Sequence, residues 1–140
     1  KLIDFGLASI RFQGKLAGKT IAIWGLSFKP NTDDMRDAPS IAVIRKLLDH
    51  NVKIHVYDPI AIANAKSIFE NRLDYYIDRY ECLRGADLLL ILTEWNEFRK
   101  PDFQKMKGLL AKSVIFDGRN LFSPKQMKEE GFVYEGVGLL

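Results

Sequence analysis

The stretch from Ile21 to Ser40 constrains the fold of this chain more than any other part of the sequence. It begins as a short apolar run, continues as a loop with two cations and three carboxylates, and reaches Pro39, which opens an amphipathic segment. Proline is favoured at the first position of a helix because the N–H that it lacks would have no partner there. The pattern therefore predicts a strand, a charged loop and the start of a helix.

The same alternation of short apolar runs and amphipathic segments continues along the chain. The continuous apolar run at 86–92 is typical of a strand that is covered on both faces, and Thr93 is expected to cap the short helix that follows. Asn51 is expected to close the helix opened by Pro39 in the left-handed conformation. The expected strands are 20–24, 52–57, 74–77, 86–92, 113–116 and 132–134, and the expected helices are 39–48, 61–69, 80–84, 94–98, 101–110 and 125–130.

Strands that alternate with helices predict an α/β fold, a three-layer doubly wound parallel sheet of the Rossmann-like kind. The first strand should be central, with strand order 3-2-1-4-5. The carboxyl ends of strands one, four and five then meet at the crevice where ligands bind in such sheets. These ends carry Lys29 and Arg36, residues 93–95, and Arg119, so we expect three cations at one crevice.

The loop after the first strand does not match the usual nucleotide motifs. A phosphate cradle built from backbone N–H groups needs repeated glycines, but only Gly25 is present, and Lys29 and Pro30 stand where further glycines would be. Recognition by side chains remains, in which Lys29, Arg36 and Arg119 pair with phosphate oxygens through charge-assisted hydrogen bonds.

Other interpretations of these charged residues stay open. Arg36 can instead pair with Asp33, Asp34 or Asp37 and hold the loop. Asp33 and Asp34 can form a metal or acid/base pair, although helix caps and ion-pair partners are the more common role of such residues. Asp58 stands where a dinucleotide-binding fold would hold a ribose, but Pro59 after it favours a turn.

The remaining residues with reactive or aromatic side chains receive no catalytic role. Cys82 has no His nearby in the sequence, so we do not expect it to be a nucleophile. His50 and His55 lack the spacing of metal ligands, and we expect no metal. Trp24 and Trp95 are expected to pack in the core.

Composition limits the class of protein and its partners. The chain has 140 residues, 47% of them apolar, which suits one ordinary domain. The net charge of +3 is spread along the sequence, unlike the basic face of a nucleic-acid binder. The apolar run Leu88–Leu92 is too short to cross a membrane, and a single cysteine suits a reducing compartment. We therefore expect a cytoplasmic protein with no nucleic-acid or membrane partner.

Several short motifs follow one another along the chain: residues 25–40, Tyr57-Asp58-Pro59, Ala86-Asp87, Thr93-Glu94-Trp95, Asp117-Gly118-Arg119-Asn120 and Tyr134-Glu135-Gly136-Val137-Gly138. In this order they resemble the C-terminal domain of the UDP-glucose/GDP-mannose dehydrogenase family. The resemblance runs from about Leu16 to Gly138, and the Thr-Glu-Trp, Asp-Gly-Arg-Asn and final Tyr-Glu-Gly-Val-Gly motifs resemble most the branch that acts on UDP-glucose.

The resemblance implies an enzyme that oxidises UDP-glucose to UDP-glucuronate in two NAD-dependent hydride transfers. In this family an N-terminal Rossmann domain holds most of the NAD, a central helix forms a homodimer, and the catalytic cysteine lies in the preceding domains. Residues 1–15 would then be the end of the linker helix from the central domain, and residues 16–140 the UDP-sugar-binding domain. Because the chain begins at Lys1 inside an apparent helix, we expect a piece of a longer protein that is inactive alone.

By the same resemblance, Phe28, Lys29 and Arg119 contact the UDP-sugar, and Arg36 reaches the NAD. Ser27 stands where many members have alanine. Two alternatives stay open: a dehydrogenase of another nucleotide sugar, GDP-mannose or UDP-N-acetylmannosamine, and a stand-alone module that binds nucleotides or RNA.

Overall fold

A computed structural model of the chain describes residues 16–136. The predicted linker helix at 1–15 and the residues after 136 lie outside this range. The strands are β1 (Thr20–Trp24), β2 (Lys53–Tyr57), β3 (Asp74–Tyr76), β4 (Leu88–Ile91), β5 (Val114–Asp117) and β6 (Val133–Gly136). The helices are α2 (Pro39–Leu48), α3 (Ile62–Phe69), α4 (Phe103–Leu109) and α5 (Pro124–Glu129), with single 3₁₀ turns η1 (Glu70–Arg72), η2 (Glu81–Leu83) and η3 (Asn96–Phe98).

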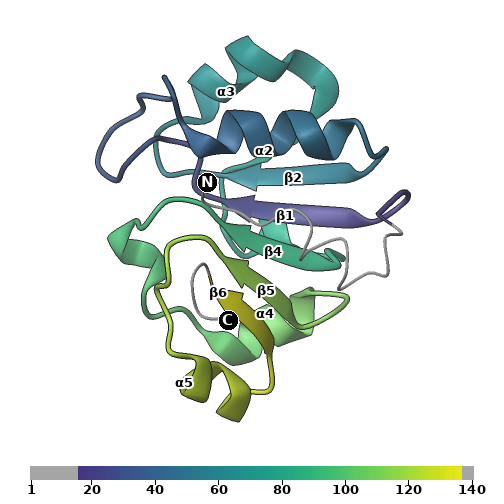
Figure 1. Cartoon of the computed structure of the whole chain (residues 1–140), viewed down its shortest axis with the longest axis vertical. Coiled ribbons are helices and arrows are strands. Elements are labelled where there is room, and N and C mark those ends of the chain that lie inside the picture. The colour runs from purple at the N-terminus through teal and green to yellow at the C-terminus, as the bar shows by residue number, and fades with distance from the viewer. Residues whose placement is uncertain (1–15, 137–140) are drawn as a thin grey trace.

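All six strands form one parallel sheet in the order β3-β2-β1-β4-β5-β6. The predicted α/β class and the order 3-2-1-4-5 are confirmed, and the last strand extends the sheet beyond β5 (Figure 1). The strand order reverses between β1 and β4. A crevice at the carboxyl edge of that pair is therefore the expected place for a ligand.

Two apolar clusters, one on each face of the sheet, make up the core. Ile21 and Ile23 of β1 pack with α2 and α3 on one face. Ala22 and Trp24 pack with η2, η3, α4 and α5 on the other. Successive side chains of a strand point to opposite faces, so a central strand covered on both sides must be apolar throughout. Trp24 is fully buried and stacks on Phe98, with ring centroids 5.0 Å apart, which confirms its packing role.

Most element boundaries agree with the predicted ones within two residues, and two details differ. Asn51 adopts the predicted left-handed conformation, with φ at 58°. The predicted helices near 80–84 and 94–98 are only 3₁₀ turns. The capping role of Thr93 is wrong: η3 has Trp95 as its N-cap residue, and the buried Thr93 hydroxyl donates to the Ser27 carbonyl instead.

The register brings four loops to one edge of the sheet. Trp24, the last residue of β1, pairs with Tyr57 and Ile91, and Ile91 pairs with Asp117. The strands thus end level with one another, and the segments that follow them start side by side.

Among residues 16–136, no helix has the length and apolar character needed to cross a membrane.

Candidate functional site

The loop that follows β1 lies tightly against the loop that follows β4. Gly25 has a φ of +99°, and a Cβ atom added to it would lie 2.7 Å from both the backbone nitrogen and the Cβ of Thr93. The Gly25 N–H donates to the Tyr57 carbonyl at 2.8 Å. Only glycine combines this backbone conformation with so close an approach, so this one residue sets the spacing of the two loops.

We predict that Gly25→Ala destabilises the domain by about 2 kcal/mol or more, because it adds backbone strain at positive φ to a clash with Thr93. Chemical denaturation followed by circular dichroism measures the change. Gly85→Ala is the matched control, since Gly85 also has a positive φ but has no atom within 4 Å of an added Cβ. Equal losses of unfolding free energy in the two variants would show that the close approach of Gly25 to Thr93 does not affect stability.

Polar groups from three other segments hold the loop of residues 25–29. The Ser40 hydroxyl donates to the Leu26 carbonyl at 2.6 Å. The Thr93 hydroxyl donates to the Ser27 carbonyl at 2.7 Å. The Asp58 carboxylate accepts hydrogen bonds from the Leu26 and Ser27 N–H groups. The backbone N–H and carbonyl groups of Leu26 and Ser27 are therefore all bonded to side chains of the protein.

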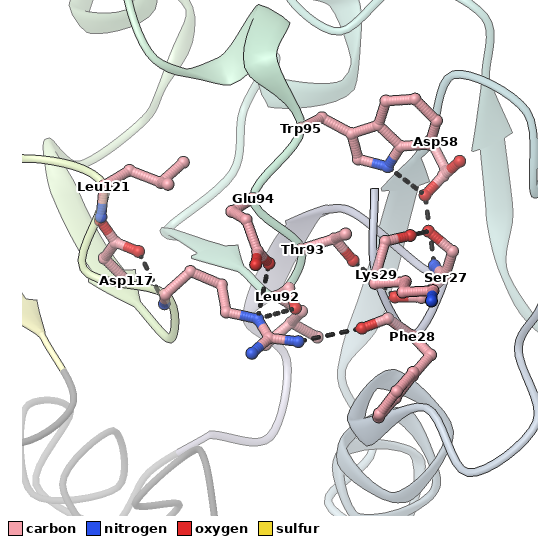
Figure 2. A network of polar contacts seen from close by, with 11 residues as sticks. Ser27, Phe28, Lys29, Asp58, Leu92, Thr93, Glu94, Trp95, Asp117 and Leu121 are labelled. Atoms are coloured by element: carbon pink, nitrogen blue, oxygen red, sulfur yellow. Dashed lines mark hydrogen bonds and ion pairs between the residues drawn. The ribbon is translucent and has the colours of Figure 1, made fainter. Parts of the chain in front are cut away.

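Arg119 reaches this loop from the turn after β5. Its Nη2 donates to the Phe28 carbonyl and its Nε to the Leu92 carbonyl, each at 3.0 Å. Nε also lies 3.2 Å from Oε1 of Glu94. Phe28, Leu92 and Glu94, which make these contacts, are labelled in Figure 2. The cation is thus fixed beside the Phe28–Lys29 segment, with its side chain 20% exposed.

Asp117 holds the turn that carries Arg119. One of its oxygens accepts from the Arg119 N–H at 2.9 Å. The other accepts from the Leu121 N–H and the Tyr134 hydroxyl, each at 2.7 Å. Burial and the nearby Asp117 charge raise the pKa of Tyr134 above its usual value, so Tyr134 stays a neutral hydrogen-bond donor. These bonds hold the turn that presents Arg119.

Phe28 and Lys29 occupy the exposed side of the loop. The Phe28 side chain is 47% exposed, and in Figure 2 its ring points away from Asp58. Lys29 is exposed, and its carbonyl accepts from the Ser27 hydroxyl at 2.9 Å. The structure therefore brings the Phe28–Lys29 segment and Arg119 together at the carboxyl edge of the sheet. This is the arrangement expected of an anion site with cations from two segments. Their contact with a UDP-sugar remains a prediction.

Arg36 pairs with Asp34, one of the interpretations left open above. Its Nε donates to Oδ1 of Asp34 at 3.0 Å and its Nη2 to Oδ2 at 2.9 Å. These hydrogen bonds lower the pKa of Asp34 to about 2. The Arg36 side chain is 88% exposed and lines a shallow hollow with Met35 and Ile68, among others; neither Lys29 nor Arg119 lines it. Contact between Arg36 and NAD remains a prediction.

The metal interpretation of Asp33 and Asp34 finds no support in the geometry. Asp34 is paired with Arg36, and the Asp33 carbonyl accepts from the Asn64 side chain at 2.7 Å. Within residues 16–136, no three His, Cys, Asp or Glu side chains form a group that could hold a metal ion. Asp34 therefore serves the shape of the loop through its bonds to Arg36.

Cys82 is completely buried on the side of the sheet that packs against α4. Burial raises the pKa of its thiol far above the usual value, so a negligible fraction is thiolate near neutral pH. Its Sγ lies 3.9 Å from the Ile23 carbonyl. Such a thiol is inert and structural.

We predict that a water-soluble thiol reagent does not label Cys82 in the native protein at pH 8, and that it labels one equivalent after unfolding in guanidinium chloride. Both burial and the raised pKa keep the nucleophilic thiolate out of reach. Absorbance of the released chromophore measures the stoichiometry. Full labelling of the folded protein would contradict this placement.

Sequence reasoning missed the residues that hold the site in place. It treated Asp58 as a turn former, which is confirmed, since Oδ1 of Asp58 accepts from the Ile60 and Ala61 N–H groups. It did not find the bonds that the other oxygen makes to the loop after β1. The available signal was an aspartate at the carboxyl end of a buried strand, a pattern shared by Asp58 and Asp117.

Comparison with known proteins agrees with this geometry. Residues 22–124 match the family model described as "UDP-glucose/GDP-mannose dehydrogenase family, UDP binding domain". This chain belongs to the UDP-glucose/GDP-mannose dehydrogenase family. It is 44% identical over 132 residues to a UDP-glucose 6-dehydrogenase of Pseudomonas aeruginosa, and this match covers 91% of this chain and 29% of the relative. It is 42% identical over 126 residues to the UDP-glucose 6-dehydrogenase TuaD of Bacillus subtilis, covering 90% of this chain and 27% of that protein.

Solved structures of the dehydrogenase family share the fold. A UDP-glucose dehydrogenase from Pyrobaculum islandicum superimposes with a TM-score of 0.78 at 30% identity, over 94% of this chain and 28% of that one. An NDP-N-acetyl-D-galactosaminuronic acid dehydrogenase from Methanosarcina mazei superimposes with a TM-score of 0.79 at 27% identity, over 95% of this chain and 27% of that one. This chain thus spans less than a third of the length of these relatives.

Proposed function

We propose that this chain is the UDP-sugar-binding domain of an NAD-dependent UDP-glucose 6-dehydrogenase. The observation that carries the proposal is the Arg119 guanidinium, bonded to the Phe28 carbonyl beside Lys29 at the point where the strand order reverses. Guanidinium and ammonium groups from two separate segments suit the two phosphates of a nucleotide sugar. Curated relatives of 42% and 44% identity carry the name of this enzyme.

The full-length enzyme would oxidise the C6 alcohol of UDP-glucose to the carboxylate of UDP-glucuronate, with two NAD as the hydride acceptors. Within this domain, Lys29 and Arg119 would bind the diphosphate, and Phe28 would cover the sugar nucleotide. The nucleophilic cysteine would come from another part of the longer protein, because the single thiol of this chain is buried with a raised pKa. The isolated domain would then be inactive.

The residues after β1 do not suit this domain to hold the NAD pyrophosphate by itself. A dinucleotide site aims backbone N–H groups at the phosphates, but here Leu26 and Ser27 direct theirs at the Asp58 carboxylate. We therefore assign most of the NAD site to the rest of the longer protein, with Arg36 as a single contact from this domain. The same proposal includes a homodimeric enzyme that works in the cytoplasm.

We predict that Lys29→Ala or Arg119→Ala in the full-length enzyme raises the KM for UDP-glucose at least about tenfold, since a charge-assisted bond contributes roughly 1.5–3 kcal/mol. Steady-state NADH formation measures the change. Lys53→Ala is the matched control, because this exposed cation stands at the amino end of β2, at the opposite edge of the sheet. Unchanged KM values in both site variants would contradict the anion site.

We also predict that the full-length protein binds UDP more tightly than GDP. The relatives named above act by their names on UDP-glucose, and a site shaped for a pyrimidine rejects the larger purine. Isothermal titration calorimetry with the two nucleotides measures the difference. A preference for GDP would instead assign the domain to a GDP-sugar dehydrogenase.

A further inference from the structure

We propose that Asp58 is a positioning residue for nucleotide-sugar binding, and that its Oδ2 fixes the loop of residues 25–29 on which Phe28 and Lys29 are presented. The inference deepens the proposed function and rests on it. Asp58 lies on the far side of the loop backbone from the exposed Phe28 ring (Figure 2). It therefore acts through the loop and not by touching the ligand.

The two oxygens of Asp58 have separate tasks. Oδ1 accepts from the N–H groups of Ile60 and Ala61 at 2.9 and 2.8 Å, which forms the local turn after β2. Oδ2 accepts from Leu26 at 2.7 Å and from Ser27 at 3.3 Å, both in the loop after β1. The local turn would form without the second oxygen. Oδ2 is thus the group that ties the two loops together.

A third donor joins Oδ2 from the loop after β4. The indole Nε1 of Trp95 lies 3.3 Å from Oδ2, and the Trp95 side chain is buried as expected. Figure 2 shows this indole directed at the carboxylate. One oxygen therefore connects the ends of β1, β2 and β4, which are three of the four strands whose loops meet at the candidate site.

Asp58 is buried among hydrogen-bond donors. The residue is 2% exposed, and a polar group buried in this way is tolerated only when hydrogen bonds replace its lost hydration. Five N–H groups surround it. An amide at this position has one oxygen and an NH₂ group, so it cannot accept from donors on both sides.

The bonds to Oδ2 decide which atoms of the loop face outward. With the Leu26 and Ser27 N–H groups turned toward Asp58, the loop cannot offer them to a phosphate. The Phe28 carbonyl faces the opposite way and accepts from Arg119. Asp58 thereby favours recognition of the ligand by Phe28, Lys29 and Arg119 over recognition by backbone amides.

The test is Asp58→Asn in the full-length enzyme. We expect the KM for UDP-glucose to rise at least about tenfold, because the loop loses the acceptor that orients it, while kcat and the KM for NAD change less than about threefold. A substitution that only reduced the folded fraction would lower the apparent kcat and leave the KM for UDP-glucose unchanged. Such a result would overturn the proposal.

Asp78→Asn is the matched control. Oδ1 of Asp78 accepts from the N–H groups two and three residues ahead, on Tyr80 and Glu81, just as Oδ1 of Asp58 does on Ile60 and Ala61. None of the hydrogen bonds of Asp78 in the described part of the chain reaches the loop after β1. We expect no change in the KM for UDP-glucose in this variant.

Two further measurements keep the proposal testable if Asp58→Asn folds poorly or the enzyme proves to use another substrate. Trp95→Phe removes one donor to Oδ2 and Ser40→Ala removes the bond to the Leu26 carbonyl; each should raise the KM severalfold. Hydrogen–deuterium exchange of the peptide that contains residues 25–29 should speed up in Asp58→Asn and not in Asp78→Asn. Unchanged exchange and KM would refute the positioning role, whereas faster exchange in an enzyme inactive on UDP-glucose would refute only the proposed function.

Discussion

The parallel pairing of β1 with both β2 and β4 is the constraint on which the site depends. Trp24 pairs with Tyr57 on one side and with Ile91 on the other, so β1, β2 and β4 end at the same level of the sheet. The strand order also reverses at this point, between β1 and β4. Loops from distant parts of the sequence then have to share one small volume. The absence of a side chain at Gly25 makes this possible, since a Cβ atom there would lie 2.7 Å from Thr93.

Buried carboxylates hold the two loops that carry Lys29 and Arg119. Asp58 at the end of β2 and Asp117 at the end of β5 are both almost completely buried, and each accepts several N–H or O–H groups. Hydrogen bonds to an ionised acceptor are stronger than those between neutral groups. The loops that carry Lys29 and Arg119 are consequently each held by several hydrogen bonds, and in the proposed site the ligand would meet side chains instead of backbone amides.

Arg119 and Arg36, the two arginines of the proposed site, are held in different ways. Arg119 is held by the carbonyls of Phe28 and Leu92 and by Glu94, so little of its flexibility remains to be lost on binding. Arg36 is exposed and paired only within its own loop, to Asp34. An exposed pair of this kind contributes little to stability.

The sequence by itself determined the fold class, the central place of β1, the order of five strands and the family, because apolar periodicity and short motifs are local properties of the chain. It also identified Arg119 and the Phe28–Lys29 segment as residues of one edge, since the ends of neighbouring parallel strands coincide. Only the tertiary structure decided that Thr93 bonds to Ser27, that Arg36 pairs with Asp34, and that Oδ2 of Asp58 faces Leu26. These choices depend on which donors and acceptors are buried together after packing, and no local pattern records that.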